Sequence, residues 1–546
     1  MGLETAVGLT TSTDSGDMVL FEIDPAQRVP PPADTPDTTP PPAPEPPPLP
    51  DMTVPLPIWT TPSPLPDDPQ EEPIGTTAAG HDAAPGNASR VLTAPPMPAL
   101  LDPWEERVLA DPDLLGDIAF AVGTPFHLMY PARVRRNVAQ FQRAFAAAGV
   151  DGVVYYGKKA NKAACVARAC AEQGAGVDVS SVGELTAALA QGVRGDELMV
   201  TGPAKSAELL WLASRHGAVI ALDALDELDR LLGAGLEARV LLRVLPDGSD
   251  SRFGMTGAEL DEAVTLLAGR ERIRLCGFSF HLSGYDAAAR AELGAALTWR
   301  CLRARELGHP AELLSLGGGF GVDYVPARAW AEFTEHAGPE WFHAGKSFDS
   351  YYPYHFPVPG AAMLAAVLNH PVAPGGTLAR LAGEHGIRLA VEPGRALLAH
   401  AGSTVFGVRG AKTRRAGAVD AESGGGLPYR LLTVDGTSLS LSEQWFGSEY
   451  LPDPLLWPRR PGTDSGAGAP TPTSVGAASC LESDMLSWRR IPLPRPAEAG
   501  DLLVYPNTAG YQMDSNESGF HELPLPPKVV LHETDGGRMR WALDAR

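Results

Sequence analysis

A short segment that places two lysines after a buried strand carries the strongest chemical signal in the chain. Residues 153–156 are apolar or aromatic, as in a buried strand, and Lys158 and Lys159 follow almost directly. A helical pattern begins next, and α/β enzymes build reactive sites where a strand gives way to a helix. A partly desolvated amine there can lose its proton and attack a carbonyl carbon. We therefore expect Lys159 to be a nucleophile, although most lysines in loops are only solvated.

Eight strand-like segments alternate with helical patterns from residue 153 onward. Such units in about 250 residues predict a parallel (β/α)8 barrel, or TIM barrel. An open, doubly wound sheet is the alternative, but no nucleotide-binding fingerprint follows the first strand. The predicted strands cover residues 153–156, 177–180, 198–201, 219–222, 240–244, 277–281, 313–316 and 388–391.

Residues that suit one particular cofactor follow three of these strands. They are His281 at the end of the sixth strand, Gly317, Gly318 and Gly319 after the seventh, and Glu392 and Arg395 after the eighth. Bare backbone N–H groups and an arginine suit a phosphate. A carboxylate favours the protonated form of a pyridine nitrogen, and an imidazole can stack on the pyridine ring. Each residue alone has a structural explanation, such as a tight turn or an ion pair. Together with a Schiff base at Lys159, they predict pyridoxal 5'-phosphate as the cofactor.

The composition changes along the chain and predicts four regions. The first 100 residues hold 24 of the 53 prolines and few aromatic residues, so they cannot form a core. A strand–turn–strand pattern over residues 119–130 is expected to join a C-terminal β domain. The predicted regions are a disordered tail (1–100), N-terminal strands (101–130), the barrel (131–397) and a β domain (398–546) with loop insertions at 410–427 and 458–477.

Charge and cysteine content disfavour several classes of protein. The net charge of −22 argues against binding to nucleic acids or anionic membranes. The five cysteines are widely spaced without a CxxC pair, so neither disulfides nor a metal site is expected. No apolar run of about 18 residues and no signal-peptide pattern occurs, which favours a cytoplasmic protein without membrane contact.

Eight motifs, in order along the chain, resemble those of one enzyme family. The family is the pyridoxal-phosphate decarboxylases with an alanine-racemase-type barrel, which includes diaminopimelate, ornithine and arginine decarboxylases. The motifs are YGKKAN (156–161), GAGVDVSSVGEL (174–185), RFG (252–254), FSFHLSG (278–284), GGGF (317–320), EPGR (392–395), CLESD (480–484) and GY (510–511).

The resemblance implies a role for each matching residue. Lys159 resembles the Schiff-base lysine, His281 the histidine that stacks on the cofactor ring, and Glu392 the carboxylate on the ring nitrogen. Cys480 resembles an acid that reaches the active site of the partner subunit and protonates the product there. This implies a homodimer with shared active sites and an amino-acid substrate. The residues that resemble phosphate contacts are Gly317, Gly318, Gly319, Arg395 and Tyr511.

The chain departs from the family pattern where relatives recognise their substrates. The serine that usually contacts the phosphate is displaced by one residue, to Ser283. Leu481 follows the cysteine where relatives carry an acid, and Glu482 comes one residue later. The segment 435–446 lacks the arginine that binds a distal carboxylate in diaminopimelate decarboxylases. We expect Glu482 and Tyr511 to contact the substrate, and a substrate other than meso-diaminopimelate or ornithine.

Three functions remain open at this point. An amino-acid α-decarboxylase is preferred. A racemase or epimerase would need acid–base groups on both faces of the substrate, for which Lys159 and Cys480 could serve. The cysteine motif is nevertheless typical of the decarboxylases. A non-catalytic, proline-rich scaffold with a degenerate barrel is the third reading, and the intact motif residues argue against it.

Overall fold

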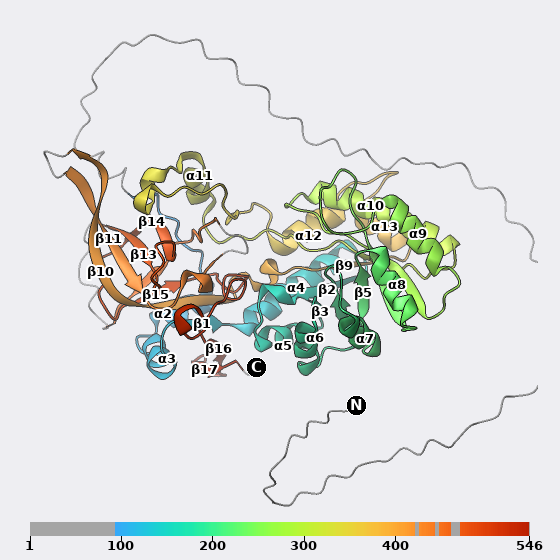
Figure 1. The fold of residues 1–546 in the computed structure, drawn as a ribbon, viewed down its shortest axis with the longest axis horizontal. Coiled ribbons are helices and arrows are strands. Elements are labelled where there is room, and N and C mark those ends of the chain that lie inside the picture. Colours follow the sequence, from blue (N-terminus) through green and yellow to red (C-terminus); the bar gives the residue numbers. More distant parts are fainter. Residues whose placement is uncertain (1–92, 421–424, 443–446, 460–469, 545–546) are drawn as a thin grey trace, which may run out of the picture. The chain divides into compact units, whose positions relative to one another are not determined.

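The computed structural model describes residues 93–420, 425–442, 447–459 and 470–544. Within them, eight parallel strands form a closed barrel in sequence order (Figure 1), and β2 pairs with β9 to close it. The predicted barrel is confirmed, because each of the eight predicted segments overlaps one of these strands. The strands are β2 (Gly152–Gly157), β3 (Gly176–Val179), β4 (Leu198–Val200), β5 (Val219–Leu222), β6 (Ala238–Arg243), β7 (Ile273–Ser279), β8 (Leu313–Ser315) and β9 (Arg388–Val391).

Helices connect the strands and cover the outside of the barrel (Figure 1). Short polar residues fix where several of them begin: Ser181, Ser206 and Thr256 each accept a hydrogen bond from a backbone N–H of the first turn. These caps satisfy backbone N–H groups that would otherwise lack a partner at the start of each helix. The helices are α4 (Pro131–Ala148), α5 (Ala164–Glu172), α6 (Val182–Ala190), α7 (Ala207–Arg215), α8 (Leu225–Gly233), α9 (Gly257–Leu267), α10 (Ala287–Glu306), α12 (Gly360–Asn369) and α13 (Leu378–Glu384).

Alternation along the barrel strands separates two apolar layers. In β5, Val219 and Ala221 belong to the inner layer together with Tyr155. Ile220 and Leu222 belong to the outer layer, which packs against the helices. Side chains therefore fill the barrel interior, and a binding site can form only at an end of the barrel, as in other proteins of this architecture.

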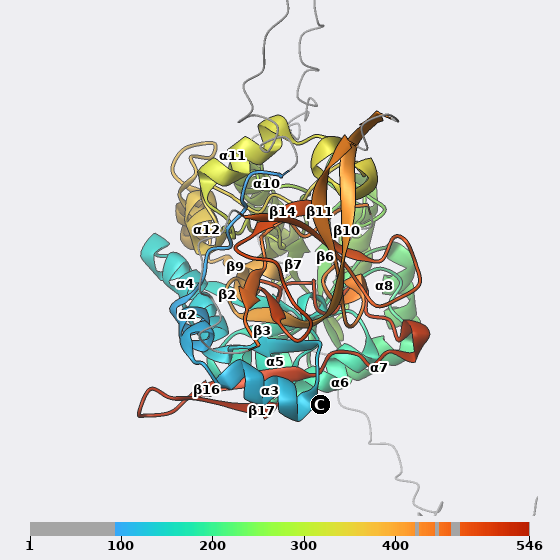
Figure 2. The ribbon, with the colours of Figure 1, turned by 90° about the vertical axis from the view of Figure 1, so that its left-hand side faces the viewer.

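A second sheet combines strands from both ends of the described chain. Strand β1 (Phe126–Met129) pairs antiparallel with β10 (Gly402–Asp420) and parallel with β16 (Lys528–Glu533), and Figure 2 shows β16 lying beside the N-terminal elements. The expectation that a segment before residue 130 joins the C-terminal β domain is confirmed for β1. The remaining strands of this nine-stranded sheet, counted over the described residues, are β11 (Gly425–Val434), β12 (Leu455–Trp457), β13 (Thr471–Gly476), β14 (Met485–Leu493), β15 (Leu502–Tyr505) and β17 (Met539–Leu543).

The predicted strand–turn–strand over residues 119–130 is wrong in its first half. Residues 119–122 instead end helix α3 (Leu114–Val122), which follows helix α2 (Pro103–Ala110). The Asp111 carboxylate accepts the Leu114 N–H at the start of α3. Leu115 and Ile118, with Leu114, then bury one helical face against β1. The apolar run therefore has helical spacing that the strand interpretation overlooked.

The loop insertions predicted at 410–427 and 458–477 are also wrong in part. Residues 410–420 and 425–427 belong to the paired strands β10 and β11, in which Lys412 lies opposite Leu431. Residues 471–476 form β13, which lies between β11 and β14. Thr473 and Ser474 are buried there, because small and β-branched polar side chains fit a sheet interior. The segments 421–424 and 460–469 lie outside the described residues.

The predicted tail ends earlier than residue 100. Met97 is fully buried, and its N–H donates to the Asp453 carboxylate at 2.7 Å. The Leu100 N–H donates to the Tyr324 carbonyl at 2.8 Å. The predicted disorder otherwise concerns residues 1–92, which lie outside the described part. Among the described helices, none combines the length and apolar character that crossing a bilayer requires.

Candidate active site

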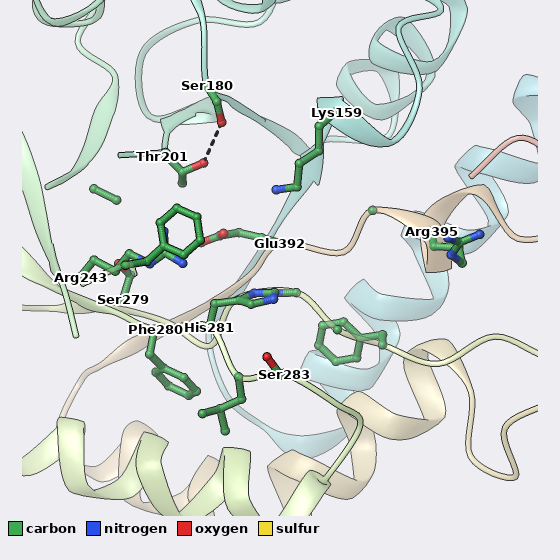
Figure 3. Close-up of a pocket in the computed structure, with 18 of the residues that line it drawn as sticks. Lys159, Ser180, Thr201, Arg243, Ser279, Phe280, His281, Ser283, Glu392 and Arg395 are labelled. Carbon is green, nitrogen blue, oxygen red and sulfur yellow. Dashed lines mark hydrogen bonds between the residues drawn. The ribbon is translucent and has the colours of Figure 1, made fainter. Parts of the chain in front are cut away.

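A cavity of about 500 Å³ opens among residues that follow the barrel strands. This volume is typical of sites for small molecules. Figure 3 shows the Lys159 amine pointing into the space that Glu392, His281 and Ser283 border. The structure thus brings most of the sequence-predicted residues together. Those that line the cavity are Lys159, His281, Ser283, Gly318, Gly319, Glu392, Arg395 and Tyr511.

The turn of three glycines after β8 is packed too closely for side chains. A Cβ atom on Gly317 would lie 2.4 Å from the Phe280 carbonyl oxygen, and one on Gly318 would lie 2.7 Å from the Glu392 carbonyl oxygen. The Gly318 N–H donates to His281 Nδ1 at 3.3 Å. Gly317 lies beneath the cavity and Gly318 lines it, so the turn presents backbone rather than side chains.

Lys159 lies in a short 3-10 helix directly after β2 and is paired with an acid. Its Nζ is 3.5 Å from Asp178 Oδ2, and the lysine side chain is 54% exposed because it projects into the cavity. Asp178 also accepts the Thr201 hydroxyl at 2.6 Å. The negative charge of Asp178 raises the pKa of Lys159, while burial acts in the opposite direction. Asp178 therefore favours the protonated form of this amine in the ligand-free site, against the effect of burial.

Glu392 is a buried carboxyl group whose pKa lies near neutral pH. It accepts the Ser315 hydroxyl at 2.5 Å. Burial raises its pKa to about 7, with a further contribution from the charge of Asp178. A carboxyl group of this kind can share a proton with a basic ring nitrogen.

His281 faces the cavity with a neutral ring. Its side chain is accessible from the cavity, but the surrounding walls remove most of its water, and this desolvation lowers its pKa to about 4. The positive charges of Lys159 and Arg243 act in the same direction. A neutral imidazole is flat and can stack on an aromatic ligand without adding charge.

The β domain contributes part of the cavity wall. The Tyr511 N–H donates to the Ala160 carbonyl at 2.8 Å, which ties this tyrosine to the segment that contains Lys159. Arg395 is buried, and its Nη1 donates to the Gly510 carbonyl at 2.9 Å. Its guanidinium lies 4.0 Å from the Tyr352 ring centroid and 5.0 Å from that of Tyr511. Arg395 is thus a fixed cation at one side of the cavity.

Arg243 and Tyr352 line the cavity, although the sequence assigned neither of them a role. Arg243 ends β6, donates to Asp223 at 3.2 Å, and lies 4.5 Å from the Phe253 ring centroid. Its position at a strand end was visible in the sequence. Tyr352 lies in the irregular segment between α11 (Ala327–His336) and α12. The only signal for it is the aromatic run 351–356.

Cys480 and Glu482 do not line the cavity of their own chain. Both are exposed, on the loop between β13 and β14. The Cys480 Sγ lies 3.2 Å from His521 Nε2. Asp484 braces this loop by accepting the N–H of Ser438 at 2.7 Å. The predicted site residues therefore fall into two groups, a cavity and a surface loop.

The residues around the cavity fit pyridoxal phosphate. Lys159 offers an amine for its aldehyde, and Glu392 offers a carboxyl group for its ring nitrogen. Arg395 and the glycine turn offer a cation and backbone N–H groups for its phosphate. These groups belong to three different segments of the chain, which end at the same cavity.

Comparisons with known proteins agree with this chemistry. The model of the family described as "Pyridoxal-dependent decarboxylase, pyridoxal binding domain" matches residues 131–347. An uncharacterized protein of Sinorhizobium fredii, y4yA, is 35% identical over 431 residues, which are 78% of this chain and 91% of that protein. A diaminopimelate decarboxylase of Actinosynnema pretiosum is 28% identical over 444 residues, which are 76% of this chain and 86% of that protein.

Solved structures show the same fold at lower identity. A diaminopimelate decarboxylase from M. jannaschii in complex with L-lysine has a TM-score of 0.59 at 19% identity, covering 79% of this chain and 91% of that one. A lysine decarboxylase from Selenomonas ruminantium has a TM-score of 0.57 at 20% identity, covering 81% of this chain and 99% of that one. The chain belongs to the family of pyridoxal-dependent decarboxylases, and its cofactor is pyridoxal phosphate.

Proposed function

We propose that this chain is an amino-acid α-decarboxylase that works as a homodimer with shared active sites. The observation that carries the proposal is the convergence of Lys159, Glu392 and Arg395 on one cavity. When bound, pyridoxal phosphate withdraws electrons from the α-carbon of an amino acid, so that its bond to the carboxyl group can break.

Residues of the cavity bind and orient the cofactor in this proposal. Lys159 would hold the aldehyde carbon of the cofactor through its side-chain amine. His281 packs its neutral imidazole on the ring. Glu392 shares a proton with the ring nitrogen, which its raised pKa favours. The residues assigned to the phosphate are Ser283, Gly317, Gly318, Gly319, Arg395 and Tyr511.

Cys480 acts in the active site of the partner subunit. Its thiol donates a proton to the α-carbon after CO2 has left, and its sulfur keeps the negative charge until it is reprotonated. The exposed position of Cys480, outside its own cavity, supports action on another copy of the chain. His521, 3.2 Å from the sulfur, is placed to return the proton. Glu482 and Tyr511 contact the substrate.

The substrate is an amino acid other than meso-diaminopimelate or ornithine. Leu481, next to the proposed acid, is 51% exposed and presents an apolar side chain. An apolar group binds a charged substrate end poorly, because the charge would lose its water without gaining a partner. We expect selection for a substrate whose side chain carries no charge near Cys480.

Release of CO2 from a panel of amino acids tests this function. The wild-type protein should release CO2 from at least one of them, and Lys159→Ala should not. Lys412→Ala is the control, because Lys412 is exposed on β10. Exchange of the α-hydrogen with solvent, without release of CO2 from any amino acid, would instead indicate a racemase or epimerase.

A further inference from the structure

Arg290 is a fully buried arginine whose charge has no anionic partner in the described chain. It lies in the first turn of α10, behind the glycine turn that lines the cavity. Its Nη2 donates to the Gly318 carbonyl at 2.9 Å. Its Nε and Nη1 are buried without hydrogen-bond partners among the described residues. The charge of Asp286 acts on Arg290, but its carboxylate accepts the Ala289 N–H at the start of the helix.

Such a buried cation is costly unless something compensates it. Loss of water lowers the pKa of Arg290 to about 10, so the guanidinium still carries its charge at neutral pH. Removing a charge from water without a partner is unfavourable, because the interior of the protein does not replace the lost hydration. The Phe320 ring, with its centroid 5.6 Å away, offers only a weak attraction. An anion bound nearby would provide the missing compensation.

The geometry of the glycine turn shows where that anion would bind. Nη2 is close enough to Gly319 that a Cβ atom there would lie 2.9 Å from it. The Gly318–Gly319 peptide is trans, so the Gly319 N–H points away from the carbonyl that Arg290 contacts. Among the described residues, no acceptor bonds to that N–H. Gly318 and Gly319 both line the cavity, whereas Arg290 does not.

The other arginine near this wall is already engaged with the protein. Arg395 Nη1 donates to both Gly510 and Gln512, and its guanidinium is stacked near two tyrosine rings. A phosphate carries close to two negative charges at neutral pH. Arg395 alone, with part of its guanidinium bonded to the protein, would balance the charge of a phosphate incompletely.

We propose that Arg290 is a phosphate-positioning residue that acts through the Gly318–Gly319 peptide from behind. It fixes the peptide so that the Gly319 N–H donates to the phosphate, and its hydrogen bond polarises that N–H. It also supplies a buried positive charge opposite the anion. The inference rests on the proposed binding of pyridoxal phosphate in this cavity, and it adds a cation that does not touch the ligand.

A comparison of two ligands separates this role from a structural one. Full-length protein freed of cofactor is titrated with pyridoxal phosphate and with pyridoxal, which lacks the phosphate. Arg290→Met should weaken binding of pyridoxal phosphate roughly tenfold to a hundredfold, as expected for loss of charge-assisted contacts. Its affinity for pyridoxal should change less than about threefold. Arg290→Lys keeps the charge and should lose less affinity for pyridoxal phosphate than the Met variant.

Arg300→Met is the matched control, because Arg300 is a buried arginine of the same helix that contacts Gly257 and Asp261 instead. It should not change the ratio of the two affinities. An equal loss of both ligands in Arg290→Met, or no loss, would overturn the proposal. If Arg290→Met does not fold, an equal loss of both ligands in Arg290→Lys overturns it as well.

Inorganic phosphate tests the anion site without the rest of the cofactor. Inorganic phosphate should raise the melting temperature of the wild-type protein. It should raise the melting temperatures of Arg290→Met and Arg290→Lys by less. If wild-type protein binds neither pyridoxal nor pyridoxal phosphate, the proposed function fails. The response to inorganic phosphate then tests the role of Arg290 by itself. An equal rise in melting temperature in the wild type and the variants would contradict that role.

Discussion

Lys159 Nζ and Asp178 Oδ2 lie 3.5 Å apart and join the carboxyl ends of the neighbouring strands β2 and β3. The ligand-free lysine is therefore a charged member of an ion pair rather than a free nucleophile. Attack on an aldehyde requires a neutral amine. Lys159 must therefore lose the proton that the charge of Asp178 stabilises before it can bind the cofactor covalently.

Replacing Asp178 should make the lysine capture its cofactor faster at neutral pH. Asp178→Asn removes the charge that raises the pKa of Lys159, and the asparagine oxygen can still accept the Thr201 hydroxyl. The neutral fraction of the amine grows roughly tenfold for each unit by which its pKa falls. The rate of cofactor uptake, followed by absorbance from pH 6 to 9, should rise at each pH below the pKa.

Asp223→Asn is the control for this change, because Asp223 pairs with Arg243 and not with the lysine. Its uptake rate should keep the wild-type dependence on pH. An Asp178→Asn protein that takes up the cofactor more slowly than wild type at neutral pH would show that the carboxylate assists rather than restrains Lys159.

The contact between Cys480 and His521 predicts a change in thiol reactivity. Among the cysteines, Cys480 is exposed and the other four are buried, so alkylation by iodoacetamide reports on this thiol. His521→Gln removes the imidazole at 3.2 Å that can accept the thiol proton. The alkylation rate at pH 7 should fall several-fold. His532→Gln, which alters an exposed histidine elsewhere, should leave the rate unchanged, and equal rates in all three proteins would refute the coupling.

Mixing two inactive variants tests whether active sites are shared. Lys159→Ala and Cys480→Ala each remove one essential group, and a general acid typically contributes a factor of 10²–10⁴. In a mixed dimer, one site retains both groups if they come from different chains. After unfolding and refolding together, an equal mixture should regain about one quarter of wild-type activity, from the fraction of intact sites in a twofold dimer.

A mixture of Lys159→Ala with Glu392→Gln should regain no activity, because both residues line the cavity of one chain. If the Lys159→Ala and Cys480→Ala mixture also stays inactive, Cys480 does not act across subunits.

Gly394 is predicted to be required because it lies against a cavity tyrosine. A Cβ atom there would lie 2.6 Å from the Tyr511 hydroxyl and 3.1 Å from the Ala160 Cβ. Gly394→Ala should displace Tyr511, with a cost of about 1–3 kcal/mol typical of overpacking. Binding of pyridoxal phosphate should weaken accordingly, by roughly tenfold or more. Gly410→Ala is the control, since no atom lies within 4 Å of the added carbon, and an equal affinity in both variants would contradict the crowding.

The barrel and most of its cavity could be predicted because they depend on local patterns. A buried strand such as 153–156 can be recognised from its apolar residues alone. The residues that follow such a strand lie at the rim of a parallel barrel. The same pattern predicts that Lys159, His281 and Glu392 share one rim, and all three line the cavity. The short strands of the β domain were harder, because Thr473 and Ser474 are polar residues in a sheet interior, which composition alone assigns to a loop.

What the sequence could not predict depends on contacts between distant segments. The pairing of Lys159 with Asp178 depends on the register between the neighbouring strands β2 and β3. Tyr352 reaches the cavity from a segment without regular structure. Arg290 looks like an ordinary helical arginine in the sequence, and its burial behind the glycine turn follows only from where α10 packs.

Mapping the site of cofactor attachment tests the central claim most directly. Protein loaded with pyridoxal phosphate is reduced with borohydride, which fixes the cofactor to the amine that carries it, and is then digested and analysed by mass spectrometry. We predict the added mass on the peptide that contains Lys159, and no such peptide from Lys159→Ala. Attachment to another lysine of the wild-type protein, or no attachment, would contradict the account.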